Sequence, residues 1–289
     1  MQPRSKQLVP LEILHARKGV EIAATARVSP NAKIGEGTTI GDWCIIDDGV
    51  EIGKYNTIKN NVVIEGRAKI GDGCIIWPFT VIGNHSHDLK FSADERTATV
   101  LGEDVVVREF TNIHAGTIPG GEGTAIGDRT YLMSHTHIGH DSYLENDCLL
   151  SQGTTLGGEV RICDHAIIGG CTAIHQLCTI GRHSIIGGCS KITMDVIPYG
   201  MSDGNPQNLT GLNIVGLRRN GFPDEDIRTI KEVYKSLFLS TDRLWAQRVE
   251  TAREVYGGIK VADDILGFIS SESRRIIAKP FNRHKREDQ

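Results

Sequence analysis

The chain has 289 residues, of which 39% are hydrophobic and 24% are charged, and its formal net charge is −4. This composition excludes wholesale disorder and a membrane-embedded body. No run approaches the roughly 18 consecutive apolar residues of a membrane helix, and the polar stretch Met1 to Pro10 lacks the apolar core of a secretion signal.

After an N-terminal extension, residues 1–19, an aliphatic residue recurs at every sixth position. One register runs from Ile22 to Ile82, a second from Leu101 to Ile113 and a third from Ile126 to Ile192, with 11, 3 and 12 positions and no miss. Period six predicts short strands separated by bends, three of which close a triangular coil of roughly 18 residues. Such coils stack about 4.8 Å apart through parallel strand pairing. We therefore predict a mainly β protein with a parallel β-helix over residues 20–198.

Glycine often follows the repeating aliphatic residue, as in Ile40-Gly41 and Ile52-Gly53. It marks a bend with strained backbone or a close approach between coils. The seven cysteines are odd in number and form no C-x-x-C pair, which disfavours a disulfide framework or a cysteine zinc site. We expect most of them to be small buried wall residues of a cytoplasmic protein.

Two insertions, at 84–100 and 119–125, interrupt the repeat, and loops that leave a rigid scaffold commonly carry binding groups. Residues 199–289 are predicted as a connector, Met201–Leu212, and a helical domain. Pro223 followed by three acids starts a helix that continues to Phe238. Further helices are predicted at Leu244–Tyr256 and Asp263–Ile277, before a frayed tail.

Six of the eleven histidines gather in two places, around the first insertion and in the motif SHTHIGHD at 134–141. Since position n stacks under n + 18, His140 lies under Gly158, and Asp141 lies under Glu159. The pair Gly157-Gly158 then exposes a backbone N–H near the imidazole of His140. Such a pair suits proton removal by the base, oxyanion stabilisation by the amide, and tautomer control by Asp141. A plain corner turn explains the two glycines equally well.

The ordered motifs SHTHIGHD, TLGGEV, IIGGCTAIHQLCTIG, IIGGCS and NIVGLRRNGF follow NHSHDLKF and NIHAGTIPGGEGT. Together they resemble the bacterial acyl-[acyl-carrier-protein]–UDP-N-acetylglucosamine O-acyltransferases of lipid A biosynthesis, over roughly residues 20–240. The resemblance implies a left-handed coil, a homotrimer with sites between neighbouring subunits, a UDP-sugar acceptor and no cofactor. It also implies that the acyl donor is carried on the phosphopantetheine of acyl carrier protein.

The same resemblance implies a role for each matching residue. His140 is the general base for the sugar 3-hydroxyl, Asp141 its carboxylate neighbour and Gly158 the oxyanion amide. The implied substrate-binding residues are Asp88, Lys90, His87, His114, His137, Glu159, His175, Gly188, Asn213 and Arg219. Among these, Gly188 matches the position whose side chain limits acyl length, and a glycine there implies room for a longer chain. Asn213 and Arg219 lie near the nucleotide and the donor, and Asp88 and Lys90 contact the sugar and phosphates.

Three positions depart from the family pattern. Glu159 stands where the family usually has a histidine, Val215 where it often has a glutamate, and His87 where it commonly has an amide. A carboxylate in place of an imidazole changes the local charge and suits a 3-amino sugar as well. The ester or amide product, the exact acceptor and the acyl length therefore stay open.

The same scaffold is compatible with two other functions. A metal hydratase of the gamma carbonic anhydrase type needs a third histidine about two coils before His135 and His140, and counting back from His140 lands in RTATV, which has none. We therefore expect no metal site. An inactive sugar-binding scaffold is disfavoured by the retained His140, Asp88, Lys90 and His175.

The net charge is −7 over residues 1–213 and +3 over residues 214–289. A basic helical face with Arg228, Lys231 and Lys235 suits the acidic acyl carrier protein, or is only a solvated surface. We expect neither a nucleic-acid partner nor an integral membrane segment.

Overall fold

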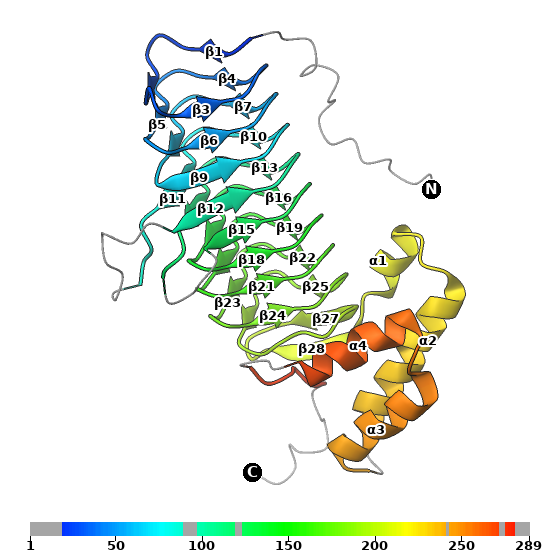
Figure 1. Cartoon of the computed structure of the whole chain (residues 1–289). Helices are drawn as coiled ribbons and strands as arrows, with labels where there is room; N and C mark the ends of the chain where they lie inside the picture. Colours follow the sequence, from blue (N-terminus) through cyan, green and yellow to red (C-terminus); the bar gives the residue numbers. More distant parts are fainter. Residues whose placement is uncertain (1–18, 89–96, 119–122, 241–242, 272–274, 281–289) are drawn as a thin grey trace.

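The structure is a computed structural model that describes residues 19–88, 97–118, 123–240, 243–271 and 275–280. Figure 1 shows a long prism of stacked coils with a group of helices beside its C-terminal end. This arrangement confirms the predicted fold class, a parallel β-helix followed by helices.

Three sheets form the faces of the prism, and each full coil gives one short strand to each sheet. Sheet A contains, in spatial order, β1 (Glu21–Ile22), β4 (Thr39–Ile40), β7 (Thr57–Ile58), β10 (Ile75–Ile76), β13 (Val106–Val107), β16 (Tyr131–Leu132), β19 (Leu149–Leu150), β22 (Ile167–Ile168), β25 (Ile185–Ile186), β27 (Gly200–Asp203) and β28 (Asn208–Leu212). Sheet B contains β2 (Arg27–Val28), β5 (Ile45–Ile46), β8 (Val63–Ile64), β11 (Val81–Asn84), β14 (Asn112–His114), β17 (His137–Ile138), β20 (Thr155–Leu156), β23 (Ala173–Ile174) and β26 (Lys191–Ile192). Sheet C contains β3 (Lys33–Ile34), β6 (Glu51–Ile52), β9 (Arg67–Ile70), β12 (Ala98–Leu101), β15 (Thr124–Ile126), β18 (Tyr143–Leu144), β21 (Arg161–Ile162) and β24 (Thr179–Ile180).

The repeating aliphatic side chains fill the prism. From Ile40 to Ile192 each of them is at most 4% exposed, as the period of six predicts. Parallel pairs such as Ile138 with Leu156 stack these side chains from coil to coil. At the N-terminal end the prediction is wrong for Ile22, which is 46% exposed. Of the described residues, none stacks beneath this first rung.

At the bends, close approach between coils and left-handed backbone occur at two different positions, whereas the sequence pattern predicted both at the glycine. A Cβ on Gly139 would lie 2.5 Å from the carbonyl oxygen of Gly157, so the glycine after the aliphatic residue permits close approach of two coils. The left-handed backbone occurs two residues later, as at Asp141 with φ of 58° and Glu159 with φ of 57°. Side chains with functional groups therefore stand at the strained corner positions.

Both predicted insertions are shorter than expected within the described residues. β12 begins at Ala98 and β15 begins at Thr124, inside the segments predicted as loops, and these two strands pair with each other. Because each of these strands finds a hydrogen-bonding partner in the neighbouring coil, both strands extend into the segments predicted as loops.

The segment Met201–Leu212, predicted as a connector, is instead an antiparallel hairpin of β27 and β28 that adds to the end of sheet A. It is followed by α1 (Ile214–Arg219), α2 (Asp224–Tyr234), a π-helical turn (Lys235–Leu239), α3 (Trp245–Tyr256) and α4 (Lys260–Ser270). The predicted helix starts at Pro223 and Leu244 are confirmed, because each is the N-cap residue of its helix.

The helix predicted at Asp263–Ile277 is wrong at both ends, since α4 begins at Lys260 and ends at Ser270. Ile277 instead forms a parallel β-bridge with Asp195 at the end of the prism. Apolar residues of the helices pack around Tyr199, whose hydroxyl donates a hydrogen bond to Asp264 of α4. Among the described helices, none has the length and apolar character needed to cross a membrane.

Candidate active site

The corner between β17 and β18 carries a histidine and a carboxylate in direct contact. The His140 Nδ1 lies 2.8 Å from Asp141 Oδ2, and their side chains are 18% and 3% exposed. Because a carboxylate oxygen accepts, the arrangement favours the proton on Nδ1 and leaves the lone pair on Nε2. His140 thus has the tautomer that a general base requires.

The Asp141 carboxylate is held by a residue that the sequence did not suggest. The backbone N–H of Thr117 donates to both carboxylate oxygens, at 2.9 and 3.1 Å, and its hydroxyl donates at 2.8 Å. The Asp141 N–H in turn donates to Thr124 Oγ1 at 2.9 Å. These bonds join the corner to the coil below and fix the carboxylate that orients His140.

The His140 ring lies against the next coil at Gly158, as the stacking rule predicts. A Cβ on Gly158 would fall 2.3 Å from His140 Nε2, and the carbonyl oxygen of His140 accepts from Glu159 N–H at 2.8 Å. Only glycine fits at position 158 with this ring in place. Within the described part of the chain, the Gly158 N–H is engaged in no backbone hydrogen bond, which leaves it available to an oxyanion.

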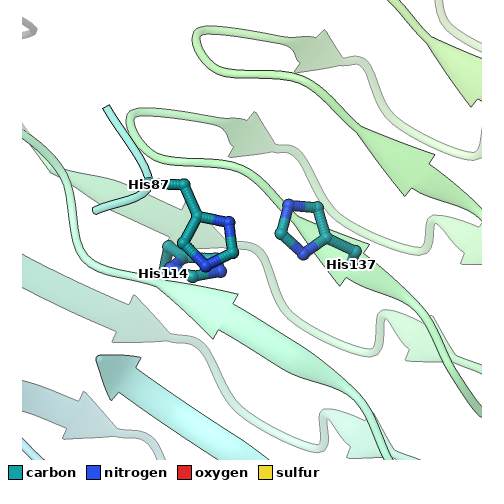
Figure 2. A group of neighbouring side chains, drawn as sticks. All are labelled: His87, His114 and His137. Atoms are coloured by element: carbon teal, nitrogen blue, oxygen red, sulfur yellow. The ribbon is translucent and has the colours of Figure 1, made fainter. Parts of the chain in front are cut away.

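Three further histidines lie beside this corner. His114 ends β14, His137 begins β17, and His87 comes from the segment after β11; Figure 2 shows their rings side by side. Ring centroids are 3.7 Å apart for His87 and His114, 4.9 Å for His114 and His137, and 5.5 Å for His87 and His137. One ligand nitrogen of each lies within 4.8 Å of the others.

Burial lowers the pKa of two members of this group. Burial lowers the pKa of His114 to about 4, with His87, His137 and His140 adding repulsion. Burial also lowers the pKa of His137, and His87 contributes in the same direction. Both shifts favour the uncharged imidazole, which offers a lone pair to a ligand.

His175 follows β23 on the same face, two coils beyond His137. Its Nδ1 accepts from Arg275 Nη2 at 2.8 Å, and Arg275 Nε donates to the carbonyl oxygen of Gln176 at 3.1 Å. The segment after α4 therefore reaches the predicted site. No sequence signal indicated this contact, because the two residues are 100 positions apart.

The loop residues are only partly placed. The Asp88 N–H donates to Ser86 Oγ at 3.1 Å, next to the histidine group, whereas Lys90 lies outside the described residues. Glu159 directly follows Gly158 and is half-buried. Val215, one of the departures, is 62% exposed on α1.

Three predicted site residues lie away from the corner that carries His140. Gly188 lies between β25 and β26, where sheet A passes into sheet B. Asn213 caps α1 by accepting from Gly216 N–H at 3.0 Å, and it donates to the carbonyl oxygen of His183 at 2.9 Å. Arg219 is at the exposed end of the same helix. One chain therefore does not gather these residues with His140, which stands between sheets B and C.

The two histidines that a hydratase metal site would use, His135 and His140, do not lie together. His135 stacks on Phe110 at the corner between sheets A and B, with ring centroids 4.8 Å apart, and so stands on a different corner from His140. A different group of histidines meets beside the His140 corner, namely His87, His114 and His137. Counting in steps of 18 misses them because both insertions change the register.

Two family models match the chain. The model described as Udp N-acetylglucosamine O-acyltransferase, domain 2, matches residues 195–277, and the model described as bacterial transferase hexapeptide, six repeats, matches residues 49–84.

Similar proteins extend over nearly the whole chain. An acyl-[acyl-carrier-protein]–UDP-N-acetylglucosamine O-acyltransferase of Sinorhizobium fredii is 36% identical over 271 residues, which are 90% of this chain and 97% of that protein. The enzyme of the same name from Thermodesulfovibrio yellowstonii is 39% identical over 256 residues, or 89% of this chain and 98% of that one.

Solved structures agree with these relatives. A crystal structure of a UDP-N-acetylglucosamine acyltransferase superposes with a TM-score of 0.87 at 36% identity, covering 91% of this chain and all of the other. The Francisella novicida UDP-N-acetylglucosamine acyltransferase gives 0.87 at 32% identity, covering 90% of this chain and 95% of the other.

Proposed function

Because the chain belongs to the family of acyl-[acyl-carrier-protein]–UDP-N-acetylglucosamine O-acyltransferases, we propose that it moves an acyl chain from acyl carrier protein to the 3-position of UDP-N-acetylglucosamine, at the start of lipid A biosynthesis. The single observation that carries this proposal is the His140–Asp141 pair seated on Gly158, with Nε2 open to an acceptor.

The proposed reaction is direct. His140 Nε2 removes the proton of the sugar 3-hydroxyl while that oxygen attacks the thioester carbonyl carbon. The carbonyl oxygen becomes an oxyanion and accepts from the Gly158 N–H. The tetrahedral intermediate then loses the pantetheine sulfur, which receives the proton from His140. No covalent acyl-enzyme is formed, and the transfer itself needs no cofactor because the phosphopantetheine belongs to the donor.

The substrate-binding roles follow the same family match. We propose that Asp88 and Lys90 contact the sugar and phosphates, and that His87, His114, His137 and His175 line the acceptor and donor cleft. Gly188, which has no side chain, leaves room for the acyl chain. The exposed Arg228, Lys231 and Lys235 along α2 and the residue after it offer a positive face to acyl carrier protein.

A homotrimer is proposed to complete the site. His140 stands on one corner of the prism and Asn213 on another, so a single chain keeps these groups apart. Packing three prisms about a threefold axis sets one corner of a chain beside a different corner of its neighbour. A cytoplasmic location is also proposed, and the seven free thiols support it.

A 3-amino sugar is the second candidate acceptor. Glu159 directly follows the proposed oxyanion amide, and its N–H is bonded to the His140 carbonyl. A carboxylate at this place suits an acceptor that carries an ammonium group when it binds. The product would then be an amide in place of an ester.

Product analysis tests both acceptors. The protein is incubated with UDP-N-acetylglucosamine or its 3-amino analogue and a series of 3-hydroxyacyl carrier-protein thioesters of different lengths, and products are identified by mass. A 3-O-acylated sugar nucleotide is expected with the first acceptor. Turnover of the amino analogue alone would favour the second candidate, and turnover of neither would overturn the proposal.

A further inference from the structure

Three histidines from three separate elements converge beside the proposed base. One nitrogen of each of His87, His114 and His137 lies within 4.8 Å of the other two, and Figure 2 shows the His87 ring between the His114 ring below it and the His137 ring beside it. We infer that these three imidazoles form a binding site for one divalent cation of the zinc class. This inference goes beyond the proposed acyl transfer, which requires no metal.

The hydrogen bonding of His114 prepares it as a ligand. Its Nδ1 lies 2.7 Å from the carbonyl oxygen of His85, and because a carbonyl only accepts, Nδ1 carries the proton. The lone pair is therefore on Nε2. Metal-bound histidines commonly donate their other N–H to a backbone carbonyl in this way, which sets both the tautomer and the ring orientation.

The second observation is an unsatisfied buried atom. His114 is 0% exposed, and its Nε2 has no hydrogen-bond partner within the described ranges of the chain. A buried acceptor without a partner is unfavourable, and a protonated imidazole is more so. A cation at this nitrogen would satisfy it without burying a proton.

The three nitrogens can coordinate one cation after a small decrease in the distances between them. With Zn–N bonds of about 2.0–2.1 Å, tetrahedral ligands stand about 3.4 Å apart, so the widest separation has to shrink by about 1.4 Å. His114 is fixed by burial, whereas His87 is exposed in the segment after β11 and can supply the movement. Imidazole ligands select zinc, cobalt, nickel or copper over magnesium and calcium.

Three protein ligands leave a fourth position open. His114 follows Ile113, which pairs with Ile138, and His137 lies three residues before His140, so the cation would lie on the same segment of the prism as the proposed base. The open position is then available to an oxygen of a molecule bound in the cleft.

The test measures metal binding directly, without an activity assay. Tag-free full-length protein is stripped with a chelator, titrated with Co²⁺ and read by the visible absorption of four-coordinate cobalt; a parallel sample is dialysed against Zn²⁺ and analysed for bound zinc per chain. The variants are His87→Gln and His137→Gln. The control is His165→Gln, a histidine on another corner that stacks on His183.

One cation per chain is expected for the wild type and for His165→Gln, and at least about tenfold weaker binding for His87→Gln and His137→Gln. Near-zero occupancy of the wild type would overturn the inference. So would unchanged binding in both cluster variants, or equal loss in the His165→Gln control. Since His87 is exposed, its replacement leaves the fold intact, and circular dichroism verifies this.

Discussion

The imidazole of His140 rests on the Cα atom of Gly158 one coil away, so closely that a methyl group there would lie 2.3 Å from Nε2. This contact places the proposed base, His140, beside the backbone N–H of Gly158. It also means that the absence of a side chain at position 158 determines where the His140 ring can lie.

Gly158→Ala therefore removes no functional group, yet it is expected to push the His140 ring off its position. We expect kcat to fall by about 10²-fold or more, because small displacements of a base are costly. Steady-state kinetics with matched circular dichroism spectra measure this. Gly267→Ala, on α4 with nothing within 4 Å of its Cβ, is the matched control and is expected to keep full activity. Full activity in Gly158→Ala would refute the assigned contact.

Variants of His140, Asp141 and Thr117 are expected to lower kcat by successively smaller factors. His140→Ala is expected to lower kcat by about 10³-fold. Asp141→Asn, which loses the tautomer control, is expected to cost about 10- to 100-fold, and Thr117→Val, which removes only one of three bonds to the carboxylate, less than about tenfold. An Asp141→Asn variant as active as wild type would show that the carboxylate is not needed.

Acidification is expected to destabilise the metal-free protein through His114. Its pKa is about 4 in the folded state against the usual 6.5, so between these values the unfolded chain binds the proton and the folded chain does not. Stability is thus fully present above pH 6.5 and is lost as the pH falls toward 4, by at most about 3 kcal/mol.

Urea unfolding at fixed protein concentration between pH 4.5 and 7.5 measures this loss. The His114→Gln variant is expected to lose less stability than the wild type over the same interval. Carboxylates titrate in both proteins, so the difference isolates the histidine. Parallel curves for the two proteins would contradict the assignment.

Tyr199→Phe is expected to loosen the helices from the prism. The Tyr199 ring is 1% exposed and its hydroxyl donates to Asp264 on α4. Removing this charge-assisted bond is expected to lower the free energy of unfolding by about 1.5–3 kcal/mol. Tyr143→Phe, at a 44% exposed ring, is the control and is expected to change it by less than about 0.5 kcal/mol.

Mixing two inactive variants tests the site between subunits. His140→Ala alters a corner of the prism and Arg219→Ala alters the end of α1, so a mixed trimer regains one intact site wherever an unmodified His140 meets an unmodified Arg219. After joint refolding of equal amounts, activity of about a quarter of wild type is expected. Efficient mixing, verified by mass under native conditions, without recovery would place both residues in one chain's site.

The sequence was sufficient where the coil is uninterrupted. His140 and Gly158 are 18 positions apart with no insertion between them, so counting alone predicts that they stack. Within each of the three registers, the period of six likewise predicts which aliphatic side chains are buried. Helix starts at Pro223 and Leu244 were equally readable because local chemistry decides them.

The other site contacts and the elements after the last coil could not be predicted from the repeat. Thr117 meets Asp141 from 24 positions away across the second insertion, and Arg275 meets His175 from 100 positions away. The hairpin at Gly200–Leu212 and the bridge from Ile277 to Asp195 form because the last coil offers a free edge, not because their own residues demand it.

Pairing in steps of one coil has a consequence for how such a chain tolerates change in length. Duplicating a whole turn well away from position 140 would lengthen the molecule and leave the chemistry untouched. Deleting a single residue between 140 and 158 would instead slide every following side chain to the wrong side of the wall. Within an uninterrupted run of coils, changes in chain length are therefore expected to be tolerated as whole coils of eighteen residues and not as single residues.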